Sequence, residues 1–206
     1  MSDRTHWNAI YADKPDQILS WYEAEPGVSA ELIATHATPG AAVDVGAGAS
    51  RLVDHLLEAG FAPVTALDIA GQGLGVSQAR LGARAAAVEW VVGDVTAWAP
   101  PRRYGLWHDR AVFHFLTEPA ARAAYAAVLD AATAPGATVV IATFAEDGPP
   151  MCSGLPVRRY APGHLAAELD AHLPGVLAPV ESRRHVHVTP AGREQRFQSS
   201  VFRKAA

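Results

Sequence analysis

The chain has 206 residues, of which half are hydrophobic and 18% are charged, and its formal net charge is −4. One domain with a full core is the default at this length. A general nucleic-acid binder is excluded, because neutralising phosphates requires a basic surface. The single cysteine, Cys152, excludes an internal disulfide framework and a multi-cysteine zinc site. No signal-like run and no apolar stretch of ~18 to 20 residues is present. We therefore expect a cytoplasmic protein that binds no metal, membrane or nucleic acid.

Apolar runs alternate with helical spacing through most of the chain. Strands are expected at residues 41–46, 64–69, 88–92, 104–110 and 137–144. Helices are expected at residues 51–57, from the second strand to about residue 81, and at residues 120–132. Strands that are apolar throughout and alternate with helices indicate a parallel sheet covered on both faces. The predicted fold class is therefore α/β.

The pattern changes after residue 146. A loop rich in proline and glycine covers residues 147–156, and a helix is expected over residues 162–171. Two strand-like segments, 183–188 and 196–202, flank the turn sequence at residues 189–192. Strands joined by a short turn are antiparallel, so we expect a C-terminal hairpin after the parallel sheet.

The strongest local motif is Val-Asp-Val-Gly-Ala-Gly at residues 43–48. Glycines at positions 46 and 48 remove side chains where a strand turns into a helix, so that a ligand can approach the backbone and the free N–H groups of the helix. A turn rich in glycine also joins strands to helices for steric reasons alone. The motif by itself leaves both interpretations open.

Two aspartates follow the next two strands. Asp68, 24 positions after Asp44, ends the second strand, where a carboxylate can accept hydrogen bonds from both hydroxyls of a ribose. Asp94 follows the third strand, where it would meet an adenine amino group with Val95 beside the ring. The alternative for Asp94 is a structural role in a turn or at a helix cap.

These segments, together with residues 104–116 (YGLWHDRAVFHFL), resemble the class I S-adenosylmethionine-dependent methyltransferases in order and spacing. The resemblance covers residues 41–146. It implies a Rossmann-like, seven-stranded, mostly parallel sheet with helices on both faces and an antiparallel C-terminal hairpin. It also implies S-adenosyl-L-methionine as the cofactor and S-adenosyl-L-homocysteine as the product. The family's glycine turn would hold the methionyl part, Asp68 the ribose and Asp94 the adenine.

The resemblance implies one methyltransferase domain over residues 1–206. Its parts would be an N-terminal lid at 1–40, a cofactor-binding core at 41–146 and an acceptor side at 147–206. The expected cofactor-binding residues are Trp7, Tyr11, Trp21, Asp44, Gly46, Ala47, Gly48, Arg51, Asp68, Ile69, Asp94, Val95 and Arg110.

The chain departs from the family at Ser50, where many members have a third glycine. A hydroxyl at the start of a helix can cap free N–H groups, so the site should tolerate the change. A dehydrogenase is the competing use of such a sheet. Residues 46–51 lack the last glycine of Gly-x-Gly-x-x-Gly, however, and no second catalytic domain follows.

The N-terminal segment contains His6-Trp7-Asn8-Ala-Ile-Tyr11 and then Ser20-Trp21-Tyr22. It resembles a lid found in small members that methylate thiols and other small molecules, and in relatives that methylate protein lysines. Aromatic side chains there would cover the cofactor and exclude water. An N-terminal helix that docks its aromatic side chains on the core is a compatible alternative.

The catalytic candidates lie where the fourth strand ends, at the cleft side of the sheet: His114, Arg110 and Asp109. His114 would take a proton from the acceptor, because imidazole titrates near neutrality. Arg110 would steady a thiolate or a carboxylate. The structural alternatives are that His114 packs beneath the cofactor at the start of a helix, and that Asp109 and Arg110 form an ion pair.

The expected acceptor-binding residues are Tyr22, His114, Arg158, Arg159 and Tyr160. The last three follow the loop after the fifth strand, where this fold places acceptor-binding elements. In the alternative interpretation they clamp that loop to the sheet. Cys152 is expected to be a bystander, because direct methyl transfer needs no covalent enzyme intermediate.

The first hypothesis for the acceptor is a small-molecule thiol. The lid and the Cys-Ser-Gly-Leu-Pro segment at residues 152–156 resemble bacterial thiol S-methyltransferases, including those that act on reduced dithiolopyrrolone antibiotics. The second is a protein lysine, for which Glu23, Glu25, Glu146 and Asp147 would have to form an acidic groove. The third is a non-catalytic module that binds a cofactor or a partner. The sequence leaves the oligomeric state open.

Overall fold

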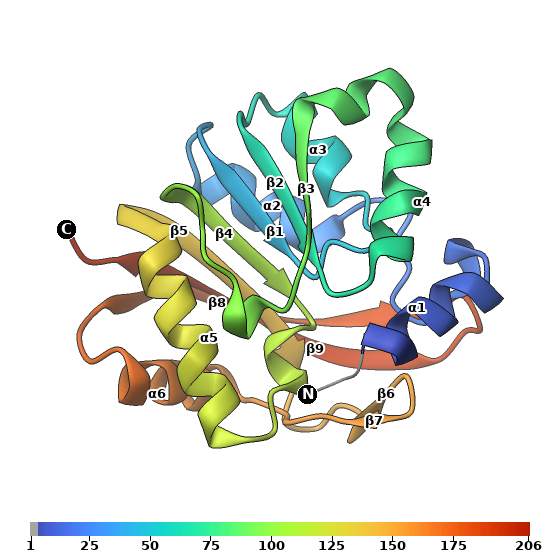
Figure 1. Cartoon of the computed structure of the whole chain (residues 1–206). Coiled ribbons are helices and arrows are strands. Elements are labelled where there is room, and N and C mark those ends of the chain that lie inside the picture. Colours follow the sequence, from blue (N-terminus) through green and yellow to red (C-terminus); the bar gives the residue numbers. More distant parts are fainter. Residues whose placement is uncertain (1–3) are drawn as a thin grey trace.

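A single sheet organises the chain, and the computed structural model describes it over residues 4–206. Residues 1–3 of the expected lid lie outside the described residues. The strands are β1 (Ala42–Val45), β2 (Val64–Asp68), β3 (Val88–Val92), β4 (Tyr104–Arg110), β5 (Thr133–Phe144), β6 (Met151–Cys152), β7 (Leu155–Pro156), β8 (Leu177–Val188) and β9 (Glu194–Lys204). Seven of these strands form the main sheet in the order β3-β2-β1-β4-β5-β9-β8 (Figure 1).

The strand directions confirm the predicted fold class. Strands β1 to β5 pair in parallel, whereas β9 runs antiparallel to β5 and β8 runs antiparallel to β9. Every residue of β1 and of β2 is buried. Strands that are buried on both faces need apolar side chains at successive positions, which is the pattern that the sequence shows.

Helices cover both faces of the sheet (Figure 1). They are α1 (Arg4–Asp13), α2 (Gly27–His36), α3 (Leu52–Glu58), α4 (Gly71–Leu81), α5 (Pro119–Ala132) and α6 (Pro162–His172). Short 3-10 turns are η1 (Asp16–Ile18), η2 (Gly82–Ala87), η3 (Val95–Ala97) and η4 (Phe113–Phe115). None of the helices within residues 4–206 is long and apolar enough to cross a membrane.

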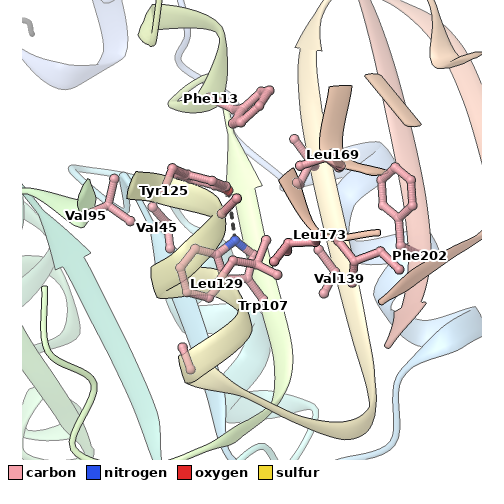
Figure 2. Packing of buried hydrophobic residues seen from close by; sticks show 14 of the residues in the cluster. Val45, Val95, Trp107, Phe113, Tyr125, Leu129, Val139, Leu169, Leu173 and Phe202 are labelled. Carbon is pink, nitrogen blue, oxygen red and sulfur yellow. Dashed lines mark hydrogen bonds between the residues drawn. The ribbon is translucent and has the colours of Figure 1, made fainter. Parts of the chain in front are cut away.

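An apolar cluster lies on each face of the sheet, between the sheet and the helices that cover that face. One lies between the sheet and α2, α3 and α4. The other lies between the sheet and α5 and α6, and Figure 2 shows Leu129 of α5 and Leu169 of α6 packed over Trp107 and Val139 of the sheet. The helices therefore fix the sheet from both sides and leave the carboxyl ends of its parallel strands for a site.

The structure corrects the expected loop at residues 147–156. This segment contains a small hairpin, in which β6 pairs antiparallel with β7. Ser153 and Gly154 take positive φ angles of 51° and 80°, as the two central residues of a tight hairpin turn do. Three expected strands are also longer than predicted: β5 begins at Thr133, β8 begins at Leu177, and β9 runs from Glu194 to Lys204.

Asp109 belongs to a buried polar network, and it forms no ion pair with Arg110. Its carboxylate accepts the N–H groups of Val112 and Phe113 and the hydroxyl of Tyr125 at 2.6 Å. The Tyr125 oxygen in turn accepts the indole N–H of Trp107 at 2.9 Å (Figure 2). The alternative of an Asp109–Arg110 ion pair is therefore not realised, because these donors hold the carboxylate on the α5 side of β4.

Burial raises the pKa of Asp109 to about 6, although the hydrogen bonds that it accepts act in the opposite direction. The pKa of an aspartate in an unfolded chain is about 3.9. Between these two values the folded chain keeps a proton that the unfolded chain has released, so the free energy of unfolding falls as the pH rises.

Asp109→Asn tests this assignment. The free energy of unfolding of the wild type, taken relative to the variant, should decrease as the pH rises from about 4 to about 6 and then level off. Urea denaturation across that range measures the difference, and its slope is the readout, whatever stability the amide itself costs. A difference that does not change with pH would contradict the raised pKa.

Candidate functional site

The glycine turn after β1 passes very close to two side chains. Gly46 and Gly48 have positive φ angles of 71° and 43°. A Cβ atom at Gly46 would lie 2.1 Å from Val112 Cγ2, and one at Gly48 would lie 2.2 Å from Tyr11 Oη. Both the backbone conformation and the space therefore require glycine at these two positions.

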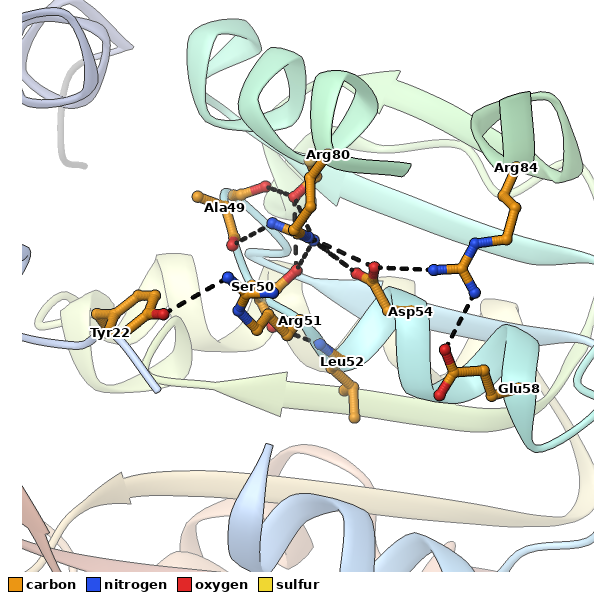
Figure 3. A network of polar contacts seen from close by, with 11 residues as sticks. Tyr22, Ala49, Ser50, Arg51, Leu52, Asp54, Glu58, Arg80 and Arg84 are labelled. Carbon is orange, nitrogen blue, oxygen red and sulfur yellow. Dashed lines mark hydrogen bonds and ion pairs between the residues drawn. The ribbon is translucent and has the colours of Figure 1, made fainter. Parts of the chain in front are cut away.

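Helix α4 holds the carbonyl groups of this turn (Figure 3). Arg80 donates to Ala49 O at 3.0 Å and to Ser50 O at 2.7 Å, and it also pairs with Asp54. Ser77 Oγ donates to Gly48 O at 2.8 Å. Strand β2 holds the other side of the turn, because the N–H groups of Gly46 and Ala47 donate to Leu67 O and that of Gly48 donates to Asp68.

Ser50 fits the start of α3, as its hydroxyl led us to expect. Its Oγ accepts the N–H of Leu52 at 3.0 Å, which is one of the free donors in the first turn of the helix. The serine therefore replaces a glycine without a loss of hydrogen bonding.

The aspartates at the ends of β2 and β3 line one cavity. Asp68 accepts the Gly48 N–H at 2.9 Å through Oδ2 and the Ala70 N–H at 2.6 Å through Oδ1. Burial raises its pKa to about 6, and the charge of Asp44 acts in the same direction. Asp94 Oδ1 accepts the Thr96 N–H at 2.9 Å and so caps η3. The structural alternative for Asp94 is thus present, yet its side chain still lines the cavity.

Asp44 lies deeper in the same cavity. Its Oδ1 is 2.7 Å from Nδ1 of His108, and Nε2 of His108 is 2.9 Å from Ser29 Oγ. Asp44 Oδ2 is buried and has no hydrogen-bond partner among residues 4–206. A buried carboxylate oxygen without a partner is costly, so this atom is the clearest place in the cavity for a donor from a ligand.

The N-terminal segment closes one side of the cavity with an aromatic cluster of Trp7, Tyr11, Trp21 and Phe115. Trp7 makes edge contacts with Trp21 and Phe115 at centroid distances of 5.7 and 5.1 Å, and Tyr11 contacts Trp21 at 6.0 Å. Helix α1 is tied to α4, because Asn8 Oδ1 accepts the N–H of Gln72.

The cavity brings most of the predicted residues together. The predicted residues that line it are Trp7, Tyr11, Trp21, Tyr22, Asp44, Gly46, Ala47, Arg51, Asp68, Ile69, Asp94, Val95 and Arg110. Gly48 lies at its edge, where Tyr11 covers it. The predicted residues that do not line it are Asp109, His114, Arg158, Arg159 and Tyr160.

His114 is fully buried next to the cavity. Its Nδ1 accepts the N–H of Phe144 at 3.3 Å, and its ring packs against Phe115 and Phe144. Burial lowers its pKa to about 3, so the imidazole carries no charge at pH 7. These contacts are those of the structural alternative, in which His114 packs at the start of a helix. Its other nitrogen, Nε2, is buried and has no partner among the described residues.

Three of the expected acceptor-binding residues hold the loop after the hairpin. Arg158 pairs with Glu168 at 2.8 Å, and Arg159 donates to Gly148 O at 3.1 Å. Tyr160 is buried and packs on Phe113. These contacts are structural, as in the second interpretation: Arg158 and Arg159 hold the segment to α6 and to Gly148, and the Tyr160 N–H holds it to Phe144 O of β5.

Arg110 fastens the segment before α2. It donates to Trp21 O at 3.1 Å and pairs with Glu23 at 2.8 Å. His187 of β8 donates to Ser20 O at 2.8 Å and lies 3.4 Å from Glu23. The guanidinium of Arg110 and the imidazole of His187 therefore hold residues 20–23 at the cavity wall.

The acidic groove considered for a lysine acceptor is not assembled. Glu23 is paired with Arg110, and the distant Glu146 and Asp147 are paired with Arg184 of β8. Arginines neutralise these three carboxylates, and the fourth candidate, Glu25, does not line the cavity, so the four do not form one acidic surface around it.

Comparisons with known proteins agree with this geometry. Residues 42–136 match the family model described as a methyltransferase domain. These residues form a methyltransferase domain. The match runs from β1 into the start of β5, and it confirms the enzyme class predicted from the sequence. No curated protein matches the chain.

Solved structures share the fold of the methyltransferase domain and its flanking segments. One comes from work on the conversion of a disulfide bond into a thioacetal group during echinomycin biosynthesis. It is 21% identical, covers 98% of this chain and 93% of its own, and has a TM-score of 0.78. The 1,6-didemethyltoxoflavin-N1-methyltransferase of Burkholderia thailandensis is 24% identical over 100% and 85% of the two chains, with a TM-score of 0.70. The N-methyltransferase NodS of Bradyrhizobium japonicum WM9 is 13% identical over 99% and 100%, with a TM-score of 0.71.

Several residues that line the cavity were not among the site residues predicted from the sequence. They include Ser29, His108, Ala111, Val112, Phe115 and Cys152. His108 had a usable signal, because it precedes Arg110 by two positions in one strand and so lies on the same face of the sheet. Ser29 and Cys152 had none, since only the folded chain brings α2 and the β6–β7 hairpin to the cavity.

Arg80 should matter more for stability than its neighbour Arg84. Arg80→Met removes the donors to two carbonyls of the glycine turn from a side chain that is only 16% exposed, and we expect it to cost about 2 kcal/mol or more. Arg84→Met is the matched control, because Arg84 is 51% exposed and pairs only with carboxylates; it should cost less than about 1 kcal/mol. Urea denaturation measures both, and equal losses would contradict the clamp.

Proposed function

We propose that this protein transfers a methyl group from S-adenosylmethionine to the sulfur of a small thiol by direct displacement in the cavity described above. The observation that carries the proposal is one continuous cavity. It joins the glycine turn and three strand-end aspartates to an aromatic wall that ends at Cys152. When bound, the cofactor supplies a methyl group on a sulfonium ion. The protein then has to hold the two reactants in line and exclude water.

The residues of the donor end, which we define as the glycine turn with Asp44, Asp68 and Asp94, fit the cofactor. Asp44 Oδ2 is a buried acceptor without a partner among the described residues, and it suits an ammonium group. Each oxygen of Asp68 accepts one backbone N–H, and a carboxylate has capacity for about four hydrogen bonds, which leaves room for the hydroxyls of a ribose. Asp94 and Val95 would receive the adenine.

The acceptor end, which we define as Trp7, Trp21, Arg110, Phe115 and Cys152, suits a soft nucleophile. Its aromatic walls exclude water, and residues 4–40 would act as the lid. Burial raises the pKa of the Cys152 thiol, whereas the charge of Arg110 acts to lower it. A thiolate that bound at this end would be stabilised by the same guanidinium group.

Methyl transfer to a thiolate needs no base at the acceptor end. His114, the expected base, lies outside the cavity lining, and its pKa of about 3 makes it a poor proton acceptor. A thiol can bind as its anion, because thiols ionise far more readily than alcohols. Within this proposal Arg110 favours the anionic acceptor, and no protein side chain accepts its proton during the transfer.

N-methylation of a small molecule is the second candidate. Two of the similar structures are those of N-methyltransferases, one of them with bound 1,6-didemethyltoxoflavin. The similar structure from echinomycin work concerns a disulfide bond instead and favours sulfur. Transfer to a protein lysine has less support, because arginines already pair with three of the four carboxylates that such an acceptor would need.

The donor end is tested with Asp68→Ala. Loss of the carboxylate removes two hydrogen bonds to the ribose and the brace on the Gly48 N–H, so the affinity for S-adenosylhomocysteine should fall roughly a hundredfold. Isothermal titration calorimetry measures the affinity. Glu58→Ala, at an exposed carboxylate on α3, is the control and should bind as the wild type does. Unchanged affinity in the Asp68 variant would remove the ribose assignment.

The acceptor class is tested with an assay of S-adenosylhomocysteine release. The purified protein is offered small thiols, phenols, carboxylates, amines and a lysine-containing protein extract, and each methylated product is identified by its mass. We expect release with thiols, and none from the Asp68→Ala variant. Release with amines alone would overturn the thiol proposal in favour of the second candidate, N-methylation of a small molecule. Release only with the extract would favour lysine, and tight cofactor binding without any release would favour a non-catalytic module.

A further inference from the structure

A chain of three buried polar side chains runs from α2 to the donor end of the cavity. Ser29 Oγ lies 2.9 Å from His108 Nε2, and His108 Nδ1 lies 2.7 Å from Asp44 Oδ1. Asp44 and His108 are each 2% exposed and Ser29 is 7% exposed. All three side chains line the cavity, and no part of the proposed methyl transfer requires His108 or Ser29 to touch a reacting atom.

The hydrogen bonds of this chain have one consistent direction for a neutral imidazole. A carboxylate only accepts, so Nδ1 of His108 carries the hydrogen that it donates to Asp44. Nε2 then accepts the hydrogen of the Ser29 hydroxyl. The serine thereby fixes the tautomer of the histidine, and the histidine fixes one oxygen of the aspartate. The second oxygen, Oδ2, is left without a partner among residues 4–206.

We propose that His108 and Ser29 are positioning residues that hold the Asp44 carboxylate for the ammonium group of the cofactor's amino-acid part. The inference rests on the proposed function, because it assumes a nucleoside thioether in the cavity. His108 keeps the carboxylate in one orientation with Oδ2 toward the ligand. Ser29 anchors the imidazole to α2, so the position of that helix is coupled to the donor end.

The physical need for such a chain comes from burial. A carboxylate with no donor in an apolar setting takes up a proton instead of keeping its charge. The hydrogen bond from His108 supplies a donor to Asp44 Oδ1 and leaves Oδ2 for the ligand.

Two ligands separate this role from a general structural one. S-adenosylhomocysteine carries the ammonium group, whereas 5′-methylthioadenosine has the same thioether nucleoside without the amino-acid part. If His108 acts through Asp44, His108→Leu should lower the affinity for S-adenosylhomocysteine about tenfold and leave that for methylthioadenosine within about twofold. Isothermal titration calorimetry measures both affinities on the full chain.

Further variants in the hydrogen-bonded series Ser29–His108–Asp44 keep the test decisive. His108→Asn places an amide donor near the position of Nδ1, so it should restore most of the affinity for S-adenosylhomocysteine. Ser29→Ala, a smaller change that keeps the imidazole, should lower that affinity about threefold, again without an effect on methylthioadenosine. In a double-mutant cycle, His108→Leu should add little to Asp44→Asn, because both act through one carboxylate.

The outcomes distinguish the two proposals. If the wild type binds neither ligand, the proposed function fails. If the wild type binds both, but His108→Leu and Ser29→Ala weaken both ligands equally or neither, the positioning role is overturned while the proposed function stands. Additive losses in the cycle with Asp44→Asn would likewise overturn it.

Discussion

The turn after β1 has to pass within contact distance of Val112 and Tyr11, and the other parts of the site depend on this approach. A Cβ atom at Gly46 or Gly48 would overlap those side chains. With glycine at both positions, the segment after β4 and the helix α1 can close against the turn. The turn is then fixed from two sides, because Ser77 and Arg80 of α4 bind its carbonyls and Leu67 and Asp68 of β2 accept the N–H groups of Gly46, Ala47 and Gly48.

The parallel register places three aspartates at one edge of the sheet, but their surroundings differ. Asp68 is held by backbone N–H groups, and its burial nevertheless favours the protonated form. Asp94 caps a short turn. Of the three, only Asp44 has a buried oxygen without a partner among the described residues. Strand ends that are equivalent in topology therefore place their carboxylates among different donors, because the segments packed against each strand end differ.

The acceptor end is built by segments that are far apart in the sequence. Arg110 of β4 and His187 of β8 both hold residues 20–23, and His6 of α1 lies 3.1 Å from the carbonyl of Ser153 in the hairpin turn. The wall of the cavity is thus a set of long-range contacts around a rigid sheet. Changes in these segments can alter the acceptor without disturbing the strand-end aspartates, which explains how one fold can serve different acceptors.

The sequence by itself determined the α/β class, the antiparallel C-terminal hairpin after a parallel sheet, and the glycine turn with Asp44, Asp68 and Asp94. These features have short-range signals: apolar runs, turn residues and fixed spacing. Only the tertiary structure decided that His114 is buried beside the cavity and that Arg158 and Arg159 clamp a loop. It also decided that Ser29 and His108 meet Asp44. The polar partners of a side chain depend on packing between distant segments, and local sequence carries no record of that packing.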